Sequence, residues 1–152
     1  MALRLDFPQL APAGERALGG VYVYVRHSGI EKPLLDLVYL RASQINGCAY
    51  CIDMHSRDLI NAGVAPGKIA LLPVWHELDG VFDARERAAL QWTEAVTGVA
   101  QSRVPDEAFE QVKAQFDDKA IADLTLAIGV INVYNRLAIS FRRPPEGAMT
   151  AA

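Results

Sequence analysis

The sequence predicts an all-α fold, and three observations support that prediction. Apolar residues recur at helical spacing, for example at Leu18, Val21, Tyr22 and Val25. Glycine, proline and capping residues divide the chain into segments of helical length. At 152 residues the chain has the size of one domain with a sizeable core, and no repeat, linker or low-complexity tract interrupts it. We therefore expect a single helical domain over residues 1–152.

Three helices are expected in the first half of the chain, over about residues 11–26, 32–45 and 48–62. A glycine follows each segment, as is typical of helix C-termini: Gly29, Gly47 and Gly63. Residues 21–25 alternate valine and tyrosine in the manner of a strand, and two glycines precede them. The wider helical spacing nevertheless favours a helix there.

Four further helices are expected beyond residue 65: a short one around residues 69–75, one over about 84–99, one beginning at 105 and a last one over about 118–141. Asp83 and Glu86 have the spacing of a capping box at the second of these. Pro105 is followed by two acidic residues, which is typical of a first helical turn. Pro144 and Pro145 end the last helix.

The last predicted helix contains the most apolar stretch of the chain, from Leu124 to Val133. Its uninterrupted apolar length falls well short of the ~20 residues that a membrane span needs, so we interpret it as a central or interface helix. Two interpretations stay open for Asn132, Asn135 and Arg136. They bond across a subunit contact, or they lie at the margin of the buried stripe and face water.

Composition narrows the classes of partner and the compartment. The net charge of −3 and the lack of a Lys/Arg cluster argue against nucleic acid or an anionic membrane as partner. Charged residues make up only 22% of the chain and apolar residues 51%, which indicates apolar surface buried between subunits. The N-terminus lacks the apolar core of a signal peptide, so we expect a cytoplasmic protein with reduced thiols.

The only two cysteines lie three residues apart, and a histidine follows four residues later, in Cys48-Ala49-Tyr50-Cys51-Ile52-Asp53-Met54-His55. On a helix the two thiols and the imidazole fall within an arc of roughly 60°. The break at residues 46–47 puts the cysteines in a first helical turn, where unpaired N–H groups favour a thiolate. A nearby histidine can accept the thiol proton. Attack of one thiolate on a peroxide would give a sulfenic acid that the other cysteine converts to a disulfide.

Three other interpretations of the two cysteines are open. Cysteine is often simply buried in a core. Cys48, Cys51 and His55 supply three zinc ligands, but no fourth is evident nearby, so we expect no metal. A structural disulfide would close too short a loop to constrain the unfolded chain much. The spacing therefore favours redox chemistry over these alternatives.

Asp36 is a candidate partner for His55. If the chain reverses at residues 46–47, the two flanking helices are antiparallel, with Asp36 about 16 Å before the turn and His55 about 12 Å after it. The carboxylate and the imidazole would then lie nearly level, and a carboxylate fixes the histidine tautomer and raises its basicity. The alternative is an ordinary solvated aspartate.

The segment from Asp36 to His55, with its signature S-Q-x-N-G-C-x-x-C-x-x-x-H, closely resembles the core of the AhpD-like alkylhydroperoxidases of the carboxymuconolactone decarboxylase superfamily. The likeness covers about residues 34–99 well and the ends loosely. It implies an AhpD-like helical bundle, whose helical hairpin carries the C-x-x-C motif, in a homo-oligomer, often a trimer or hexamer. It also implies reduction of hydroperoxides without a bound cofactor, and an external thiol reductant that the sequence does not identify.

By position, the resemblance makes Cys51 the peroxidatic thiol, Cys48 the resolving thiol and His55 a member of the proton relay. Helix-start electrostatics alone would instead favour Cys48 as the thiolate. Asp36 stands where many members have glutamate, and Tyr50 stands where the best-studied branch has histidine. Tyr50 either packs or orients a substrate, because a phenol with a pKa near ~10 is no base at neutral pH.

The sequence thus predicts a thiol-dependent peroxidase, with Cys51, Cys48, His55 and Asp36 as catalytic residues. Two alternatives remain: a lactone decarboxylase like the superfamily's namesake, which has no evident need for two cysteines, and a non-enzymatic redox sensor. Ser43 and Asn46 beside the motif are expected to hold the turn by local hydrogen bonds. Trp75 and Trp92 are expected to be core or interface anchors.

Overall fold

The computed structural model describes residues 2–147, and over this part of the chain the only regular secondary structure is helical. In chain order the elements are α1 (Phe7–Leu10), α2 (Pro12–Arg26), α3 (Lys32–Asn46), α4 (Ala49–Asn61), α5 (Pro66–Leu71), the 3₁₀ helix η1 (Leu72–Glu77), α6 (Ala84–Thr97), α7 (Val99–Ser102), α8 (Asp106–Lys113) and α9 (Asp118–Phe141). The all-α prediction is confirmed.

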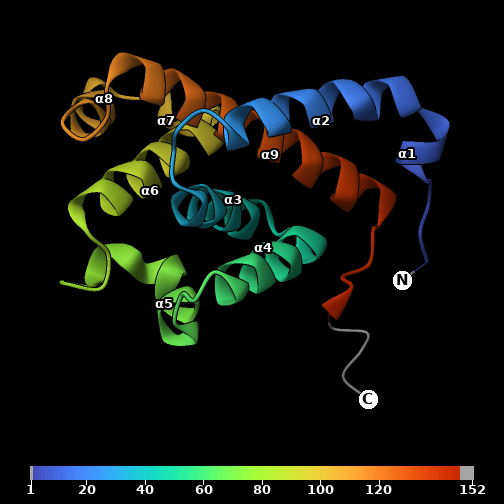
Figure 1. Ribbon diagram of the computed structural model, residues 1–152, viewed down its shortest axis with the longest axis horizontal. Helices are drawn as coiled ribbons and strands as arrows, with labels where there is room; N and C mark the ends of the chain where they lie inside the picture. Colours follow the sequence, from blue (N-terminus) through green and yellow to red (C-terminus); the bar gives the residue numbers. More distant parts are fainter. Residues whose placement is uncertain (1, 148–152) are drawn as a thin grey trace.

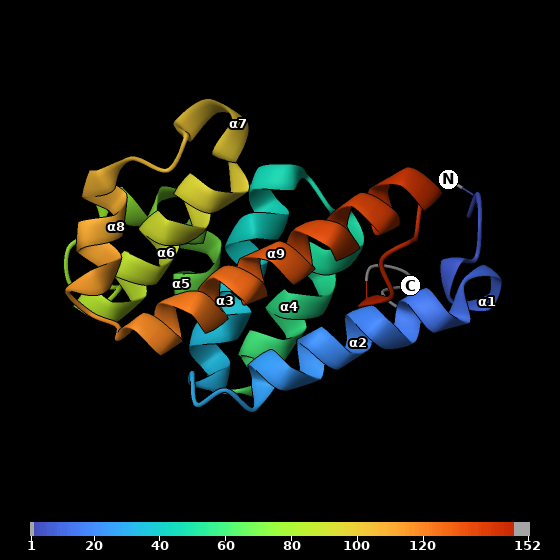
Figure 2. The ribbon, with the colours of Figure 1, turned by 90° about the horizontal axis from the view of Figure 1, so that it is seen from above.

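Helix α3 is the central element of the bundle. It packs against α4, α6 and α9, and most of its residues from Leu34 to Ser43 are buried. Helices α2 and α9 contact each other and run along one side of the molecule, while α5 and η1 lie on the opposite side (Figure 1). Seen from above, α9 passes over α3 and α4 (Figure 2). A helix that is enclosed on several sides has an almost continuously apolar sequence, which explains why α3 is rich in leucine.

Glycine, proline and capping residues in the sequence locate most helix ends within a residue or two. Gly47 has the left-handed φ of 72° and caps α3, where a residue with a Cβ would be strained. Asp83 and Glu86 form the predicted capping box of α6, with both reciprocal hydrogen bonds present. Two differences are the short helices α1 and α7, which are not predicted from the sequence. The stretch around Trp75 is a 3₁₀ helix rather than a continuation of α5.

Helix α9 is long and apolar enough to cross a membrane by length and composition. In this fold it is a packing helix, because it contacts α2, α3 and α6 and lines the largest core cluster with residues such as Leu124 and Ile128. Trp75 and Trp92 are both buried, as expected of core anchors. A second apolar face of α9 stays exposed, at Leu126 and Val133.

Polar side chains of α9 bond to α3 within the same chain, which neither interpretation of them foresees. Asn135 is fully buried, and its amide nitrogen donates to Ser43 Oγ over 3.0 Å. Asn46 donates to the amide oxygens of Asn135 (2.8 Å) and Asn132 (3.0 Å). Asn46 therefore holds the turn through α9 rather than through local hydrogen bonds, whereas the Ser43 hydroxyl does donate locally, to the Tyr39 carbonyl. These bonds fix the C-terminal end of α3 against α9.

Candidate functional site

The hairpin between α3 and α4 positions the two cysteines. After the left-handed Gly47, the Cys48 N–H donates to the Ser43 carbonyl over 3.0 Å, which closes the end of α3. Cys48 is the N-cap of α4, and its sulfur accepts a hydrogen bond from the Cys51 N–H. The cysteines thus lie at the start of a helix, where the sequence places them. They are joined as a disulfide, and both are buried.

Cys51 lines a cavity of about 570 Å³, whereas Cys48 is not among its lining residues. The cavity lies between α2, α4 and α9, and the first and last described segments of the chain form part of its wall. Arg4 fixes the first segment, because its backbone N–H donates to the Phe141 carbonyl over 2.8 Å. Aromatic and apolar side chains dominate the lining; they include Phe7, Tyr22, Tyr50, Met54, Tyr134 and Phe141. An apolar hollow that reaches one sulfur of a disulfide is suited to an organic substrate.

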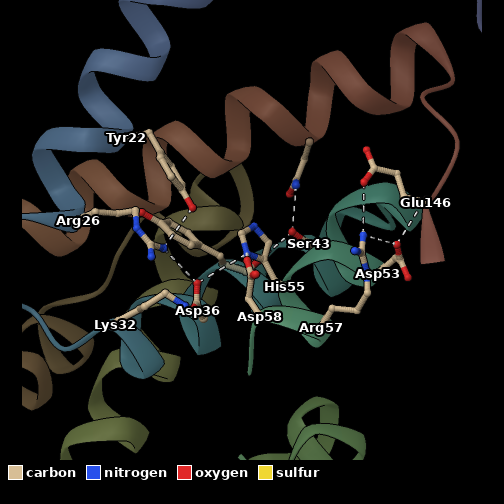
Figure 3. A network of polar contacts seen from close by, with 12 residues as sticks. Tyr22, Arg26, Lys32, Asp36, Ser43, Asp53, His55, Arg57, Asp58 and Glu146 are labelled. Atoms are coloured by element: carbon tan, nitrogen blue, oxygen red, sulfur yellow. Dashed lines mark hydrogen bonds and ion pairs between the residues drawn. The ribbon is translucent and has the colours of Figure 1, made fainter. Parts of the chain in front are cut away.

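His55 lines the same cavity one turn after Cys51, and Asp36 faces it from α3 across the hairpin. Both side chains are fully buried, so Asp36 is not a solvated aspartate. The His55 Nδ1 atom lies 3.9 Å from Asp36 Oδ1 and 3.8 Å from Asp58 Oδ2 (Figure 3). Within the described residues, neither ring nitrogen has a hydrogen-bond partner. Both distances exceed hydrogen-bond length, so these contacts are electrostatic in this structure.

Burial and two cations set the charge state of this pair. Burial lowers the pKa of His55 to about 4, and the positive charges of Arg26 and Lys32 act in the same direction. Burial raises the pKa of Asp36, while Lys32, which donates to Asp36 Oδ2 over 3.2 Å, opposes that rise. The imidazole is therefore neutral at pH 7. A neutral imidazole beside a thiol can accept its proton.

Two tyrosines and an arginine complete the surroundings of His55, and none of the three is predicted from the sequence as a site residue. The Tyr39 ring lies 5.1 Å from the His55 ring and 5.5 Å from the Tyr22 ring, between centroids. Arg26 donates to the Tyr22 hydroxyl over 3.3 Å and lies 3.6 Å from Asp36 Oδ1. The signal in the sequence was the spacing of four residues between Tyr22 and Arg26, which puts them on one face of α2.

Three of these groups have the donor types of a metal site. Ligand atoms of Asp36, His55 and Asp58 lie within 4.8 Å of one another. Asp36, however, already faces Lys32 and Arg26. Two cations on the most buried carboxylate reduce its attraction for a third, so the arrangement suits proton handling better than metal binding.

Tyr50 lies between the two cysteines in sequence and at the wall of the cavity in space. The Arg143 guanidinium stacks over its ring, 4.1 Å from the centroid. The last described segment is fixed to α4 because Asp53 Oδ2 accepts backbone hydrogen bonds from Glu146 (3.2 Å) and Gly147 (2.9 Å). Both interpretations of Tyr50, packing and contact with a substrate, stay open.

Several known proteins are similar to this chain in sequence or fold. The model of the carboxymuconolactone decarboxylase family matches residues 9–95. The uncharacterised protein YdfG of Bacillus subtilis is 36% identical over 140 residues, which are 92% of this chain and 95% of that protein. Alkyl hydroperoxide reductase AhpD of Rhodospirillum centenum is 34% identical over 80 residues, which are 50% of this chain and 42% of that enzyme.

A solved structure extends the similarity to the whole fold. A protein of unknown function from Agrobacterium tumefaciens, proposed to be an antioxidant defence protein AhpD, is 40% identical and has a TM-score of 0.91. The match covers 95% of this chain and 99% of that one. The family model spans more than half of the sequence, and YdfG and the Agrobacterium protein match more than nine-tenths of it. The chain therefore belongs to the carboxymuconolactone decarboxylase family and is AhpD-like.

Proposed function

We propose that the protein reduces organic hydroperoxides through a dithiol–disulfide cycle of Cys48 and Cys51. The observation that carries this proposal is the position of Cys51, which shares an apolar cavity with a neutral, buried His55. Cys48 is not among the lining residues of the cavity and is bonded to Cys51. The similarity to an alkyl hydroperoxide reductase over half of the chain supports the same activity.

The cycle balances in three steps. His55, assisted by Asp36, takes the Cys51 proton, and the thiolate attacks the terminal peroxide oxygen. The O–O bond breaks, giving the Cys51 sulfenic acid and an alcohol once the alkoxide is protonated. The Cys48 thiolate then attacks the Cys51 sulfur, the S–O bond breaks, and one added proton completes the water that leaves. An external dithiol returns the disulfide to two thiols by exchange.

We also propose that the protein works in the cytoplasm as a homo-oligomer. A reducing compartment supplies the thiol needed for turnover. Helices α2 and α9 border an apolar groove whose rim includes Val21, Leu126 and Val133, all more than a third exposed. A contiguous apolar surface of this kind favours contact with a second copy.

The test is peroxide consumption by the reduced protein, with tert-butyl hydroperoxide and a dithiol reductant. Cys51→Ser should abolish turnover, and oxidation should lower the intact mass of the wild type by two hydrogens. Cys48→Ser should keep one turnover and leave a sulfenic acid at Cys51 that dimedone traps. His55→Ala should slow the reaction roughly 100-fold or more. The matched control is His76→Ala, because His76 is exposed and lies outside the cavity.

Two results would contradict the proposal. A disulfide that forms with peroxide in the absence of turnover would favour the redox sensor. If neither thiol reacts with peroxide, the lactone decarboxylase, whose chemistry makes no evident use of the pair, or a structural role of the cysteines would be favoured.

A further inference from the structure

Cleavage of the peroxide O–O bond needs a proton donor as well as a base. The inference about that donor rests on the proposed peroxide reduction. The leaving alkoxide is strongly basic, so a positioned acid speeds its departure. The His55 imidazole is neutral, and its Nδ1 faces Asp36 and Asp58, which suits it to receive the thiol proton. A second donor in the cavity wall would protonate the alkoxide while His55 still holds the thiol proton.

Three tyrosines line the cavity: Tyr22, Tyr50 and Tyr134. Among the described residues, only the Tyr22 hydroxyl accepts a hydrogen bond from a cation, the Arg26 guanidinium at 3.3 Å. Tyr50 instead has the Arg143 guanidinium over its ring face. Tyr134 meets the Tyr22 ring edge-on, with centroids 6.4 Å apart.

The contact with Arg26 has two chemical consequences for Tyr22. Its oxygen accepts from the guanidinium, so its own proton is free to point elsewhere. Burial raises the pKa of Tyr22, and the adjacent Arg26 cation opposes that rise by stabilising negative charge on the phenol oxygen. Figure 3 shows the Tyr22 side chain extending from α2 with its hydroxyl directed toward the Arg26 guanidinium and the α3–α4 hairpin. The same guanidinium lies 3.6 Å from Asp36 Oδ1. Arg26 therefore contacts both Tyr22 and the carboxylate that faces His55.

We propose that Tyr22 is the proton donor to the departing alkoxide, with Arg26 as its positioning residue. As the Cys51 sulfur bonds to the terminal oxygen, the O–O electron pair moves to the alkoxide oxygen, which takes the Tyr22 proton and leaves as an alcohol. The Arg26-bound phenolate then recovers a proton from solvent, and His55 returns the thiol proton to solvent. The sum is one thiol and one hydroperoxide giving a sulfenic acid and an alcohol.

The leaving group provides the test. Alkyl hydroperoxides release an alkoxide that needs a proton, whereas peracetic acid releases acetate, which does not. In stopped-flow oxidation of the reduced protein, Tyr22→Phe should lower the rate constant for cumene hydroperoxide about 100-fold and change that for peracetic acid less than about twofold. The control is Tyr24→Phe on the same helix, because the Tyr24 hydroxyl donates to Asp123 outside the cavity. It should leave both rate constants unchanged.

Each other outcome overturns the inference. Equal loss with both oxidants would mean that Tyr22 only shapes the site, and no loss with either would mean that it is not the donor. A selective loss of alkyl hydroperoxide reduction in Tyr50→Phe or Tyr134→Phe, absent in Tyr22→Phe, would assign the proton to that residue. If the wild type reacts with neither oxidant, the proposed peroxide reduction fails, and the role of Tyr22 fails with it.

Discussion

At the residue scale, His55 is a buried base that the fold keeps uncharged. Its ring is enclosed by Tyr39 and the hairpin, and burial lowers its pKa to about 4. An unfolded chain returns the pKa to about 6.5. Between these two values the unfolded state binds a proton that the folded state does not. Stability is therefore lost as the pH falls through this window.

This linkage predicts a measurable acid sensitivity. Relative to the variant His55→Gln, the oxidised wild type should lose up to about 3 kcal/mol of unfolding free energy between pH 6.5 and pH 4. Urea unfolding followed by circular dichroism at several pH values measures both proteins. His76→Gln serves as the control and should follow the wild type, because His76 is exposed. Parallel pH profiles for His55→Gln and the wild type would show that His55 is not held neutral.

Asp36 carries a second prediction at this scale. Asp36→Asn keeps the shape of the side chain but removes the negative charge beside His55, so Cys51 should lose its proton less readily. Oxidation by cumene hydroperoxide and by peracetic acid should slow together, roughly 10- to 100-fold, because both need the thiolate. Asp58→Asn is the comparison, because Asp58 lies as close to His55 but is partly exposed, and its effect should be smaller. A loss confined to one oxidant would contradict this role.

The sequence predicts the positions of some of these residues and not of others. Asp36 and His55 are found because both belong to one hairpin, where helical rise and a single chain reversal fix their relative height. Tyr22 and Arg26 are missed because they reach the site from α2. The rotation of α2 about its own axis depends on its packing against α9, which periodicity alone does not supply.

At the scale of the elements, Gly47 allows the chain reversal that creates the hairpin. Its φ of 72° is left-handed, and an added Cβ would meet nothing within 4 Å. Gly47→Ala should therefore cost about 1–2 kcal/mol through backbone strain alone. Gly20→Ala in α2 is the matched control, because a Cβ there also meets nothing and the helical backbone favours alanine by about 0.5–1 kcal/mol.

Urea unfolding of the two oxidised variants checks the signs. The midpoint should fall for Gly47→Ala and rise for Gly20→Ala. A neutral or stabilising Gly47→Ala would mean that the turn tolerates another conformation, and that the geometry of the cysteines does not depend on this glycine.

Helix positions are predicted well where local chemistry decides them. The capping box at Asp83 and the glycine at the end of α3 act within a few residues, so the sequence contains the whole signal. The four-residue α1 is missed because a helix that short is stabilised by tertiary contact, here between Phe7 and Phe141. The bonds from Asn46 to α9 are missed for the same reason, since they join residues 86 and 89 positions apart.

At the scale of the whole molecule, the apolar groove of α2 and α9 predicts self-association. Leu126→Glu should lower the molar mass measured by light scattering at micromolar concentration, because a buried carboxylate without a partner opposes the contact. Val99→Glu in α7 is the control, since Val99 is more exposed than Leu126 and lies outside the groove. It should leave the mass unchanged. An unchanged mass in Leu126→Glu would place any contact between copies elsewhere.

The two ends of the described chain meet at the same cavity, and this affects how the protein should be prepared. Leu3 and Leu5 line the cavity at one end of the chain, and Arg143 and Glu146 line it at the other. A purification tag attached next to either described end would therefore begin close to the cavity that Cys51 lines. Rates measured on tagged protein would include the effect of the tag on substrate entry, so kinetic work should use protein from which the tag has been cleaved.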